Sequence, residues 1–498
     1  MNNEGDYLDP EGEEEDEEEE DERKEEGIMM PPTKIPRTQN LDRISALHDS
    51  VLLHILSFLP MEDVVRAGAL SRRWQFLWTS TSTLVFKRKA FDTTNDIHKF
   101  VAFVNSTLLL CRCSNIKKFV LHLSCDYGVS VPPDVNRWIR FATQNNVEDL
   151  DLNFGPDEAD YTLPQHLFTN SSLRILSASS CEIGIAPNGQ ISLISLKSLT
   201  LDSVYLSDGA IEKILSGCPV LEIFNMKRVN AVSPLDINSA SLKKLAIQQC
   251  LIGVGKYVVL EISAPNLQLL ALVGNFQRCR FRLVNISSLV KANLCFSGDY
   301  CCDNHEKMRS QSLELLEKLE HVKELHLWPW CIQVLSVGDV KGLPSPMSSC
   351  KILTLHTHVM KWDVPGIASV LQSSPDLEKL VVDLSPLYHE FKFCRKFITS
   401  CNSDGKNPWS SCKRTYSPFT HLKTVEIVDF KDVDEETVLP LIQILLLNAT
   451  VLEKMVIKIG KSGYKQCSEC TFSMEFVRLT HKLLSFPRAS PHAAILFA

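Results

Sequence analysis

Two short patterns near the C-terminus contain residue types that could do chemistry. Gly460–Ser462 reads Gly-Lys-Ser, the end of a phosphate-binding loop, but such a loop needs a glycine five residues earlier, where Met455 stands. Cys467 and Cys470 have the spacing of metal ligands, yet neither a second cysteine pair nor a His-x-x-x-His pattern follows. We therefore expect neither a nucleotide site nor a structural zinc site in this region.

Two further groups of cysteine and histidine are candidates for metal binding. Cys301 and Cys302 are followed by His305, without the spacing of a known ligand set. His356 and His358 are two residues apart and would share one face of a strand, as a metal pair or as part of a polar solvent face. No nucleophile elbow and no pair of carboxylates in a loop is found, so we predict no catalytic residue, metal site or cofactor.

One basic pattern is a candidate for protein binding. Arg278, Arg280 and Arg282 alternate with Cys279 and Phe281, so on a strand the three guanidinium groups would share one face. Such a face could bind an acidic or phosphorylated segment through bidentate contacts, or it could be an ordinary solvated strand face. We predict that this face, together with the polar loop 297–311, contacts a target protein, because recognition often resides in long loops on rigid scaffolds.

Two tryptophans follow this region in the sequence His-Leu-Trp-Pro-Trp. Trp328 and Trp330 could form an exposed aromatic contact with a partner, or they could pack a loop against a sheet. The sequence does not decide between these two roles.

The composition limits the class of protein. The chain has 498 residues, too many for one compact core, and a net charge of -8. Residues 1–26 account for -14 of this charge, so the remainder is mildly basic, too weakly to indicate nucleic-acid binding. The start of the chain is not a secretory signal and no apolar run would span a membrane, so we read the 17 cysteines as reduced thiols of a nuclear or cytoplasmic protein.

The first 80 residues fall into two contrasting parts. Residues 1–40 are acidic and then proline-containing, and we expect a disordered tail. Residues 41–80 are strongly apolar. A helical stripe runs from Val51 to Leu59, and Pro60 ends this first helix. Val64 to Leu70 predict a second short helix, and Ser71 would cap a third. Three such short helices cannot bury all their large apolar side chains on one another, so the remainder must face a partner or the rest of the chain.

The segment from Leu41 to Trp78 resembles an F-box of the form found in plant F-box proteins. The matching residues are Asp42, Ile44, Ser45, Leu47, Asp49, Leu59, Pro60, Asp63, Leu70, Ser71, Arg72, Arg73, Trp74, Leu77 and Trp78. His48 departs from the usual proline, which bears on partner affinity rather than on the fold. The resemblance implies binding to a Skp-type adaptor of an SCF ubiquitin ligase and, through it, to a cullin. The residues implied in adaptor contact or its supporting core are Leu47, Leu52, Ile55, Leu56, Leu59, Pro60, Val64, Leu70, Trp74 and Trp78.

Beyond this segment a pattern of apolar-x-x-apolar-x-apolar recurs, and between residues 116 and 377 its copies start every 21 to 33 residues, the irregular period of leucine-rich repeats. Copies start at residues 116, 147, 173, 196, 221, 242, 267, 289, 322, 350, 377, 422 and 452. Each copy predicts a short strand, and helical patterns precede several of them. We therefore predict an α/β solenoid with a parallel sheet and with helices on its convex side.

The C-terminal part of the chain resembles the FBD domain of plant F-box proteins over His421–Ser490. We expect two strands around one helix that cap the solenoid. The predicted domains are a tail at 1–40, the F-box at 41–88, the repeats at 89–405 and the FBD at 406–498.

This arrangement resembles F-box/FBD/LRR proteins. The resemblance implies a non-catalytic substrate-recognition subunit of an SCF-type ligase that raises the effective concentration of target lysines near the ubiquitin-loaded enzyme. Two alternatives remain: a small-molecule receptor whose basic concave cluster holds a polyanionic cofactor, with Arg278–Arg282 as the only hint, and a repeat scaffold outside any ligase.

Overall fold

The structure is a computed structural model that describes residues 44, 46–88, 94–123, 133–155, 161–184, 189–231, 235–252, 257–276, 278–297, 305–340, 345–385, 417–430, 435–459 and 474–498. The chain divides into two units, Met1–His48 and Asp49–Ala498. In the described part of the first unit, the Leu47 N–H donates to the Ile44 carbonyl oxygen over 3.0 Å. The predicted acidic tail lies outside the described residues.

The second unit begins with short helices, as the apolar spacing predicts. They are α1 (Asp49–Leu56), α2 (Met61–Ala67), α3 (Trp74–Leu77) and the 3-10 turn η1 (Trp78–Ser80). Pro60 directly precedes α2 with a φ of -66°, which suits the entry to a helix. The predicted cap is present as a long hydrogen bond, in which the Trp74 N–H donates to Ser71 Oγ over 3.4 Å.

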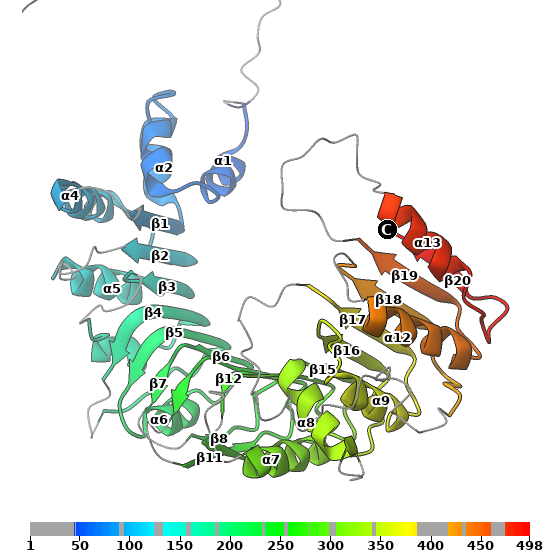
Figure 1. Ribbon diagram of the computed structural model, residues 1–498. Helices are drawn as coiled ribbons and strands as arrows, with labels where there is room; N and C mark the ends of the chain where they lie inside the picture. The colour runs from blue at the N-terminus through cyan, green and yellow to red at the C-terminus, as the bar shows by residue number, and fades with distance from the viewer. Residues whose placement is uncertain are drawn as a thin grey trace, which may run out of the picture. The chain divides into compact units, whose positions relative to one another are not determined.

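The predicted repeats form one parallel sheet, which we call the main sheet (Figure 1). Its principal ladder runs through β1 (Thr83–Arg88), β2 (Lys118–Leu123), β3 (Asp149–Asn153), β4 (Ile175–Ile183), β5 (Ser198–Leu206), β6 (Ile223–Lys227), β9 (Lys244–Gln248), β12 (Leu269–Asn275), β14 (Lys291–Ser297), β15 (Glu324–Leu327), β16 (Ile352–His356), β17 (Lys379–Asp383), β18 (Thr424–Val428), β19 (Lys454–Lys458) and β20 (Ala494–Phe497). Short strands β7 (Asn230–Ala231) and β10 (Leu251–Ile252) pair beside it. All thirteen predicted strands are confirmed, whereas the repeat pattern did not identify β1 and β20.

The register of the main sheet explains why the repeated apolar pattern predicts its strands. Equivalent positions of neighbouring repeats pair with one another, so that Lys118 lies opposite Asp149 and Lys379 lies opposite Thr424. The second and third apolar residues of each copy therefore form rows on one side of the sheet, as Leu150 and Leu152 do, and both of these are fully buried. A single repeat cannot bury its own apolar side chains, because each row of them is removed from water only when neighbouring repeats stack.

Helices pack along this apolar side of the main sheet (Figure 1). They are α4 (Thr94–Leu110), α5 (Asp134–Gln144), η2 (Gln165–Thr169), α6 (Ala210–Gly217), α7 (His305–Lys318), α8 (Pro329–Val340), α9 (Val364–Gln372), α12 (Glu435–Asn448) and α13 (Met474–Leu484). We call the opposite side of the sheet the open face. The α/β class, the parallel sheet and the helical side are confirmed.

One stretch of the helical side departs from the prediction of helices alone. Between α6 and α7 a second parallel sheet is formed by β8 (Asp236–Asn238), β11 (Val258–Ser263) and β13 (Cys279–Val284). The strand β13 contains the alternating arginines. These segments alternate buried and exposed residues with period two, so they form strands even where the solenoid would otherwise place a helix.

The C-terminal segment continues the main sheet. The two predicted strands are β18 and β19 with α12 between them, and β20 then pairs with β19. In the described residues β20 has one strand neighbour, so the FBD-like segment ends the ladder by extending it with its own strands and helices.

Candidate functional site

The three short helices at the start of the second unit separate into a core and a surface. Six large side chains of this region are buried, and they pack the helices on one another and on β1: Leu52, Leu56, Met61, Val64, Trp74 and Trp78. In α1 the buried residues Leu52 and Leu56 are four residues apart, which places them on one side of the helix. Five of the predicted site residues thus belong to the supporting core.

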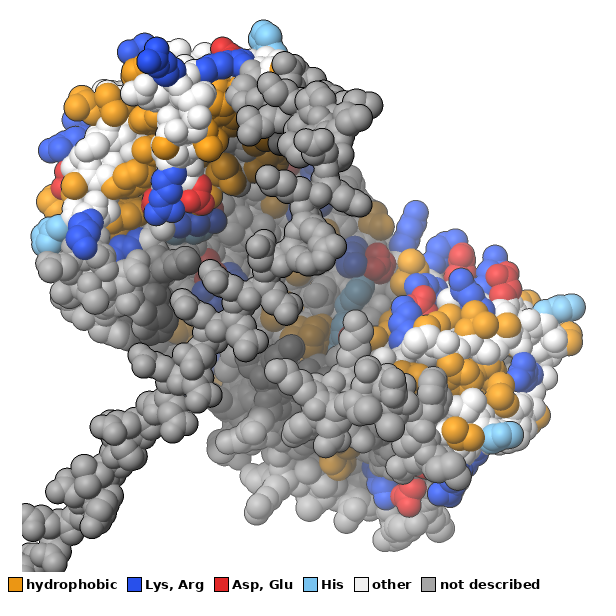
Figure 2. All heavy atoms as spheres, turned by 90° about the horizontal axis from the view of Figure 1, so that it is seen from above, with side chains coloured by type: hydrophobic (Ala, Val, Ile, Leu, Met, Phe, Trp, Pro, Cys, Tyr) orange, Lys and Arg blue, Asp and Glu red, His pale blue; other side chains and the backbone are white. Residues whose placement is uncertain are grey.

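A second set of large apolar side chains in the same helices and their connections is exposed. It consists of Val51, Ile55, Phe58, Leu59, Leu70 and Phe76, and we call it the apolar surface of α1–α3. Phe58 is 75% exposed, Leu70 72% and Phe76 62%. Figure 2 shows hydrophobic side chains gathered beside Lys and Arg at the end of the unit that carries α1 to α4. Exposed apolar groups in one place on a soluble protein are typical of a protein–protein interface.

The predicted adaptor-binding residues therefore divide by exposure. Ile55, Leu59 and Leu70 lie on the apolar surface, Pro60 is half-buried, and Leu47 is half-buried in the first unit. The sequence reasoning missed Phe58 and Phe76, although these are two of the most exposed residues of the set. In the sequence, Phe58 and Phe76 stand out only as apolar residues outside the helical stripe.

An ion pair joins the starts of α1 and α3. Arg73 Nε donates to Asp49 Oδ1 over 2.9 Å, and both side chains remain substantially exposed. An exposed pair of this kind is worth about 1 kcal/mol or less, so it helps to set the orientation of α3 but does not hold the helices together.

The predicted arginine face is present as a set of exposed side chains. Arg280 and Arg282 point away from the core on β13, and Arg278 just precedes the strand. Arg280 lies 3.3 Å from Glu314 of α7, and Arg282 lies 3.2 Å from Glu261 of β11. The face belongs to the second sheet on the helical side, so it is not the basic cluster on the strand face that the small-molecule receptor alternative requires. Its role in target binding stays a prediction, and part of the accompanying loop 297–311 lies outside the described residues.

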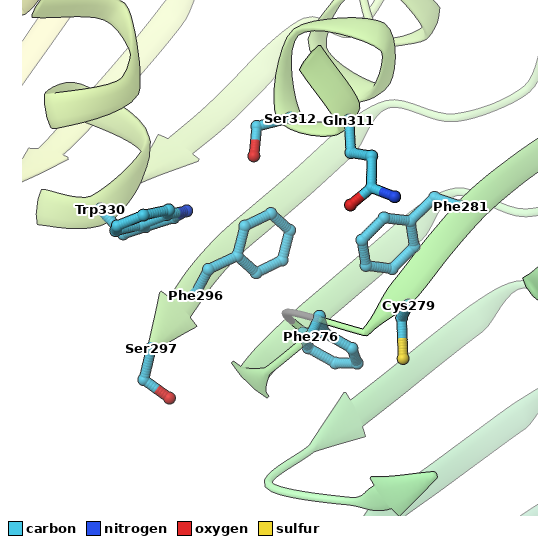
Figure 3. A pocket seen from close by; sticks show the side chains of 8 residues that line it. All are labelled: Phe276, Cys279, Phe281, Phe296, Ser297, Gln311, Ser312 and Trp330. Carbon is cyan, nitrogen blue, oxygen red and sulfur yellow. The ribbon is translucent and has the colours of Figure 1, made fainter. Parts of the chain in front are cut away.

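The side of β13 opposite the arginines contributes Phe281 to an aromatic cluster (Figure 3). The rings of Phe276, Phe281 and Phe296 have centroids 5.4 to 5.7 Å apart, with Trp330 of α8 beside them. The cavity that they line together with Gln311 and Ser312 of α7 measures about 20 Å³, room for about one water molecule. This cluster attaches the second sheet to the helices and offers no space for a small-molecule ligand.

The two tryptophans have different roles. Trp330 packs in this aromatic cluster, whereas Trp328 lies at the open face and stacks on His356 with ring centroids 4.3 Å apart. His356 and His358 do not share a strand face, because β16 ends at His356 and His358 is exposed beyond it. Among the described residues, no group of three or more His, Cys, Asp or Glu is placed to bind a metal ion.

The remaining chemical motifs give no site. Cys467, Cys470, Cys301 and Cys302 lie outside the described residues. The nine cysteines that the structure describes are free thiols, and burial raises the pKa of Cys218 to about 12, so that it stays protonated. None of the described helices is long and apolar enough to cross a membrane.

Comparisons with known proteins agree with both parts of the fold. The family model of the F-box domain matches residues 44–85, and that of the LRR repeats of FBD-associated F-box protein At5g56370 matches residues 135–382. The chain is 32% identical to the putative F-box/LRR-repeat protein At3g18150 of Arabidopsis thaliana, over 84% of this chain and 86% of that protein. It is 29% identical to the putative F-box/LRR-repeat protein At5g02930 of Arabidopsis thaliana, over 89% and 94%. The chain therefore belongs to the family of F-box/LRR-repeat proteins.

Proposed function

We propose that this chain is the substrate-recognition subunit of an SCF-type ubiquitin ligase. In this proposal the apolar surface of α1–α3 binds a Skp-type adaptor, which connects the chain to a cullin, and the repeats bind a target protein. The observation that supports it is the apolar surface itself, within the segment that matches the F-box family. No enzymatic domain is indicated by the family matches, so the chain acts by holding its partners close together.

The division into core and surface gives the proposal a physical form. The buried residues hold the helices against β1, and the exposed residues leave apolar area that a partner can remove from water. Burying one large apolar side chain is worth about 1.5–3 kcal/mol, so two or three of them supply much of the energy of a specific interface. The small-molecule receptor alternative loses its support, because Arg280 and Arg282 lie in the second sheet on the helical side and not on the strand face that this alternative requires.

The test measures adaptor binding by full-length variants. Phe58→Ala combined with Leu70→Ala removes two of the most exposed side chains of the apolar surface. Because each such contact is expected to be worth about 1–2 kcal/mol, the double variant should bind a Skp-type adaptor at least about tenfold more weakly in biolayer interferometry. Leu251→Ala is the matched control, since Leu251 is 58% exposed on β10 in the repeats.

Thermal melting establishes that the variants remain folded. Equal adaptor affinity of the double variant and the wild type would rule out the apolar surface as the adaptor site. If the folded wild type itself captures no adaptor, the ligase proposal is wrong.

A further inference from the structure

The chain leaves α4 beside the helices that carry the apolar surface of α1–α3. The Arg112 N–H donates to the Thr79 carbonyl oxygen over 2.8 Å, and Thr79 Oγ1 in turn donates to the Phe76 carbonyl oxygen over 2.7 Å. We call residues 109–117 the α4 exit segment. It is attached to η1, which directly follows α3, and Figure 1 shows α4 at the same end of the second unit as α1 and α2.

The α4 exit segment is held in place by its neighbours on both sides. The Lys117 N–H donates to the Ser82 carbonyl oxygen over 2.9 Å, directly before β1. The Ile116 N–H donates to the Asn145 carbonyl oxygen over 2.9 Å, and the Ile116 side chain is fully buried. A surface that is already fixed in this way can bind a partner at a low cost in conformational entropy.

Two leucines of this segment expose their side chains. Leu109 is 85% exposed and Leu110 is 54% exposed, and Leu109 is the most exposed large apolar residue of the part of the chain that the structure describes. The contact of α4 with the core is made by other residues, among them Val104 and Leu108, which lie four residues apart on one side of the helix. The packing of α4 therefore leaves Leu109 and Leu110 available to a partner.

The two leucines lie within reach of the same partner as Phe76. Leu109 is three residues from Arg112, so its Cα lies at most about 11 Å from the backbone that bonds to Thr79. A standard protein interface covers about 800 Å² of each partner, a patch about 30 Å across. One partner that covers the exposed ring of Phe76 can therefore also cover Leu109, which continues the apolar surface of α1–α3.

Positive charge is concentrated at the same end of the second unit. Residues 49–123 contain ten Lys and Arg and five Asp and Glu, a net charge of +5, whereas residues 124–498 contain 37 and 38, a net charge of -1. Arg112 and Lys117 of the α4 exit segment are exposed, and in the described residues neither has an ion-pair partner. This distribution of charge favours a partner that presents carboxylates beside an apolar patch.

We propose that the surface for the Skp-type adaptor continues from α3 onto the α4 exit segment. Leu109 and Leu110 contact apolar side chains of the adaptor, and Arg112 and Lys117 face its carboxylates. This inference rests on the proposed function, because it takes the adaptor as the partner. It places part of the interface outside residues 44–85, the segment that matches the F-box family model.

The experiment measures the association and dissociation rates of full-length variants with a Skp-type adaptor by biolayer interferometry. Leu109→Ala combined with Leu110→Ala should dissociate about tenfold faster than the wild type, because the loss of apolar contacts acts mainly on the dissociation rate. Leu447→Ala combined with Leu484→Ala is the matched control. These two leucines are also exposed and lie in helices of the FBD-like segment, so their replacement should leave the rate unchanged.

A second variant tests the cations independently of the leucines. Arg112→Glu combined with Lys117→Glu should associate about tenfold more slowly at low ionic strength, because charges at the rim of an interface act mainly on the association rate. The difference should shrink at about 500 mM salt, where these charges are screened. Lys197→Glu combined with Lys323→Glu is the matched control, since it changes the net charge equally through two exposed lysines of the repeats.

The outcomes separate this inference from the proposed function. If the folded leucine variant dissociates at the wild-type rate, or the folded charge variant associates at the rate of its control, the α4 exit segment is not part of the adaptor surface. The proposed function would still stand if Phe58→Ala combined with Leu70→Ala weakens adaptor binding. A leucine variant that binds the adaptor normally but loses self-association in sedimentation would assign the segment to a second copy of the chain. If the wild type binds no adaptor, both proposals are wrong.

Discussion

Gly366 lies at the closest approach of two helices on the helical side of the main sheet. An added Cβ on this residue of α9 would lie 2.0 Å from the Ile332 carbonyl oxygen and 2.6 Å from Ser336 Oγ, both in α8. The Gly366 N–H also donates to Ser336 Oγ over 2.7 Å. Because the Ile332 oxygen is a backbone atom, it cannot rotate away, and the two helices must separate to admit a methyl group.

The cost of Gly366→Ala follows from these contacts. Overpacking of a dense core costs about 1–3 kcal/mol, and a strained or lost hydrogen bond to Ser336 adds about 1 kcal/mol. Alanine recovers about 1 kcal/mol through its higher helix propensity. We therefore expect a net loss of about 1–3 kcal/mol, with the strongest effect where α8 and α9 pack on each other.

The assay combines thermal melting with hydrogen–deuterium exchange, because a long repeat array need not unfold in one step. Faster exchange should be confined mainly to α8, α9 and the strands beneath them. Gly184→Ala is the matched control, since its added Cβ would meet two side-chain atoms and no backbone atom, the Thr162 methyl at 3.1 Å and Glu182 Oε1 at 3.9 Å, and it should leave the melting temperature nearly unchanged. A Gly366→Ala protein as stable as the wild type, with unchanged exchange in α8 and α9, would refute this packing argument.

Three further outcomes are expected. Leu52→Ala removes a fully buried side chain of α1, so it should cost about 2–5 kcal/mol in urea unfolding followed by a probe of the N-terminal helices; a loss below about 1 kcal/mol would place Leu52 outside the core. Burial raises the pKa of Asp363 from its ordinary 3.8 to about 6, so the folded chain holds this proton more tightly than the unfolded chain. The free energy of unfolding should therefore fall, by at most ~3 kcal/mol, as the pH rises from about 4 to about 6. Thermal melting from pH 4 to 7 should show this dependence in the wild type and a flatter one in Asp363→Asn. If the stability of Asp363→Asn depends on pH as that of the wild type does, Asp363 is not the group responsible. Reversal of Arg278, Arg280 and Arg282 to Glu should abolish target capture in a pull-down while sparing the adaptor, and capture that persists at physiological salt would leave these residues as a solvated face.

The strands could be predicted from the sequence because their cause is local. A side chain points into the core at every second residue of a strand, so the apolar pattern marks each strand and its buried side together. The helix α8 was missed for the opposite reason. It is buried among α7, α9 and β14, and its apolar residues surround the whole helix, which leaves no periodic contrast to detect.

The functional surfaces could be identified only from the tertiary structure, because they depend on which side chains pack against one another. The sequence by itself determined that the first helices contain more apolar side chains than they can bury on one another. Only the packing of α2 on β1 and of the helices on one another decided that Leu52 belongs to the core and Phe58 to the surface. An apolar residue has the same identity in both places, and its role depends on whether a neighbour covers it.

The contact between His326 and His356 shows the same division over a longer distance in the chain. The sequence places His356 beside His358, whereas the sheet places it beside His326, thirty residues earlier. That contact follows from the register of β15 and β16 and from the end of β16 at His356, which turns His358 out of the ladder. Local periodicity determined the strands of this protein, and the stacking of repeats decided which of their polar residues meet, because the atoms that meet across strands belong to separate repeats.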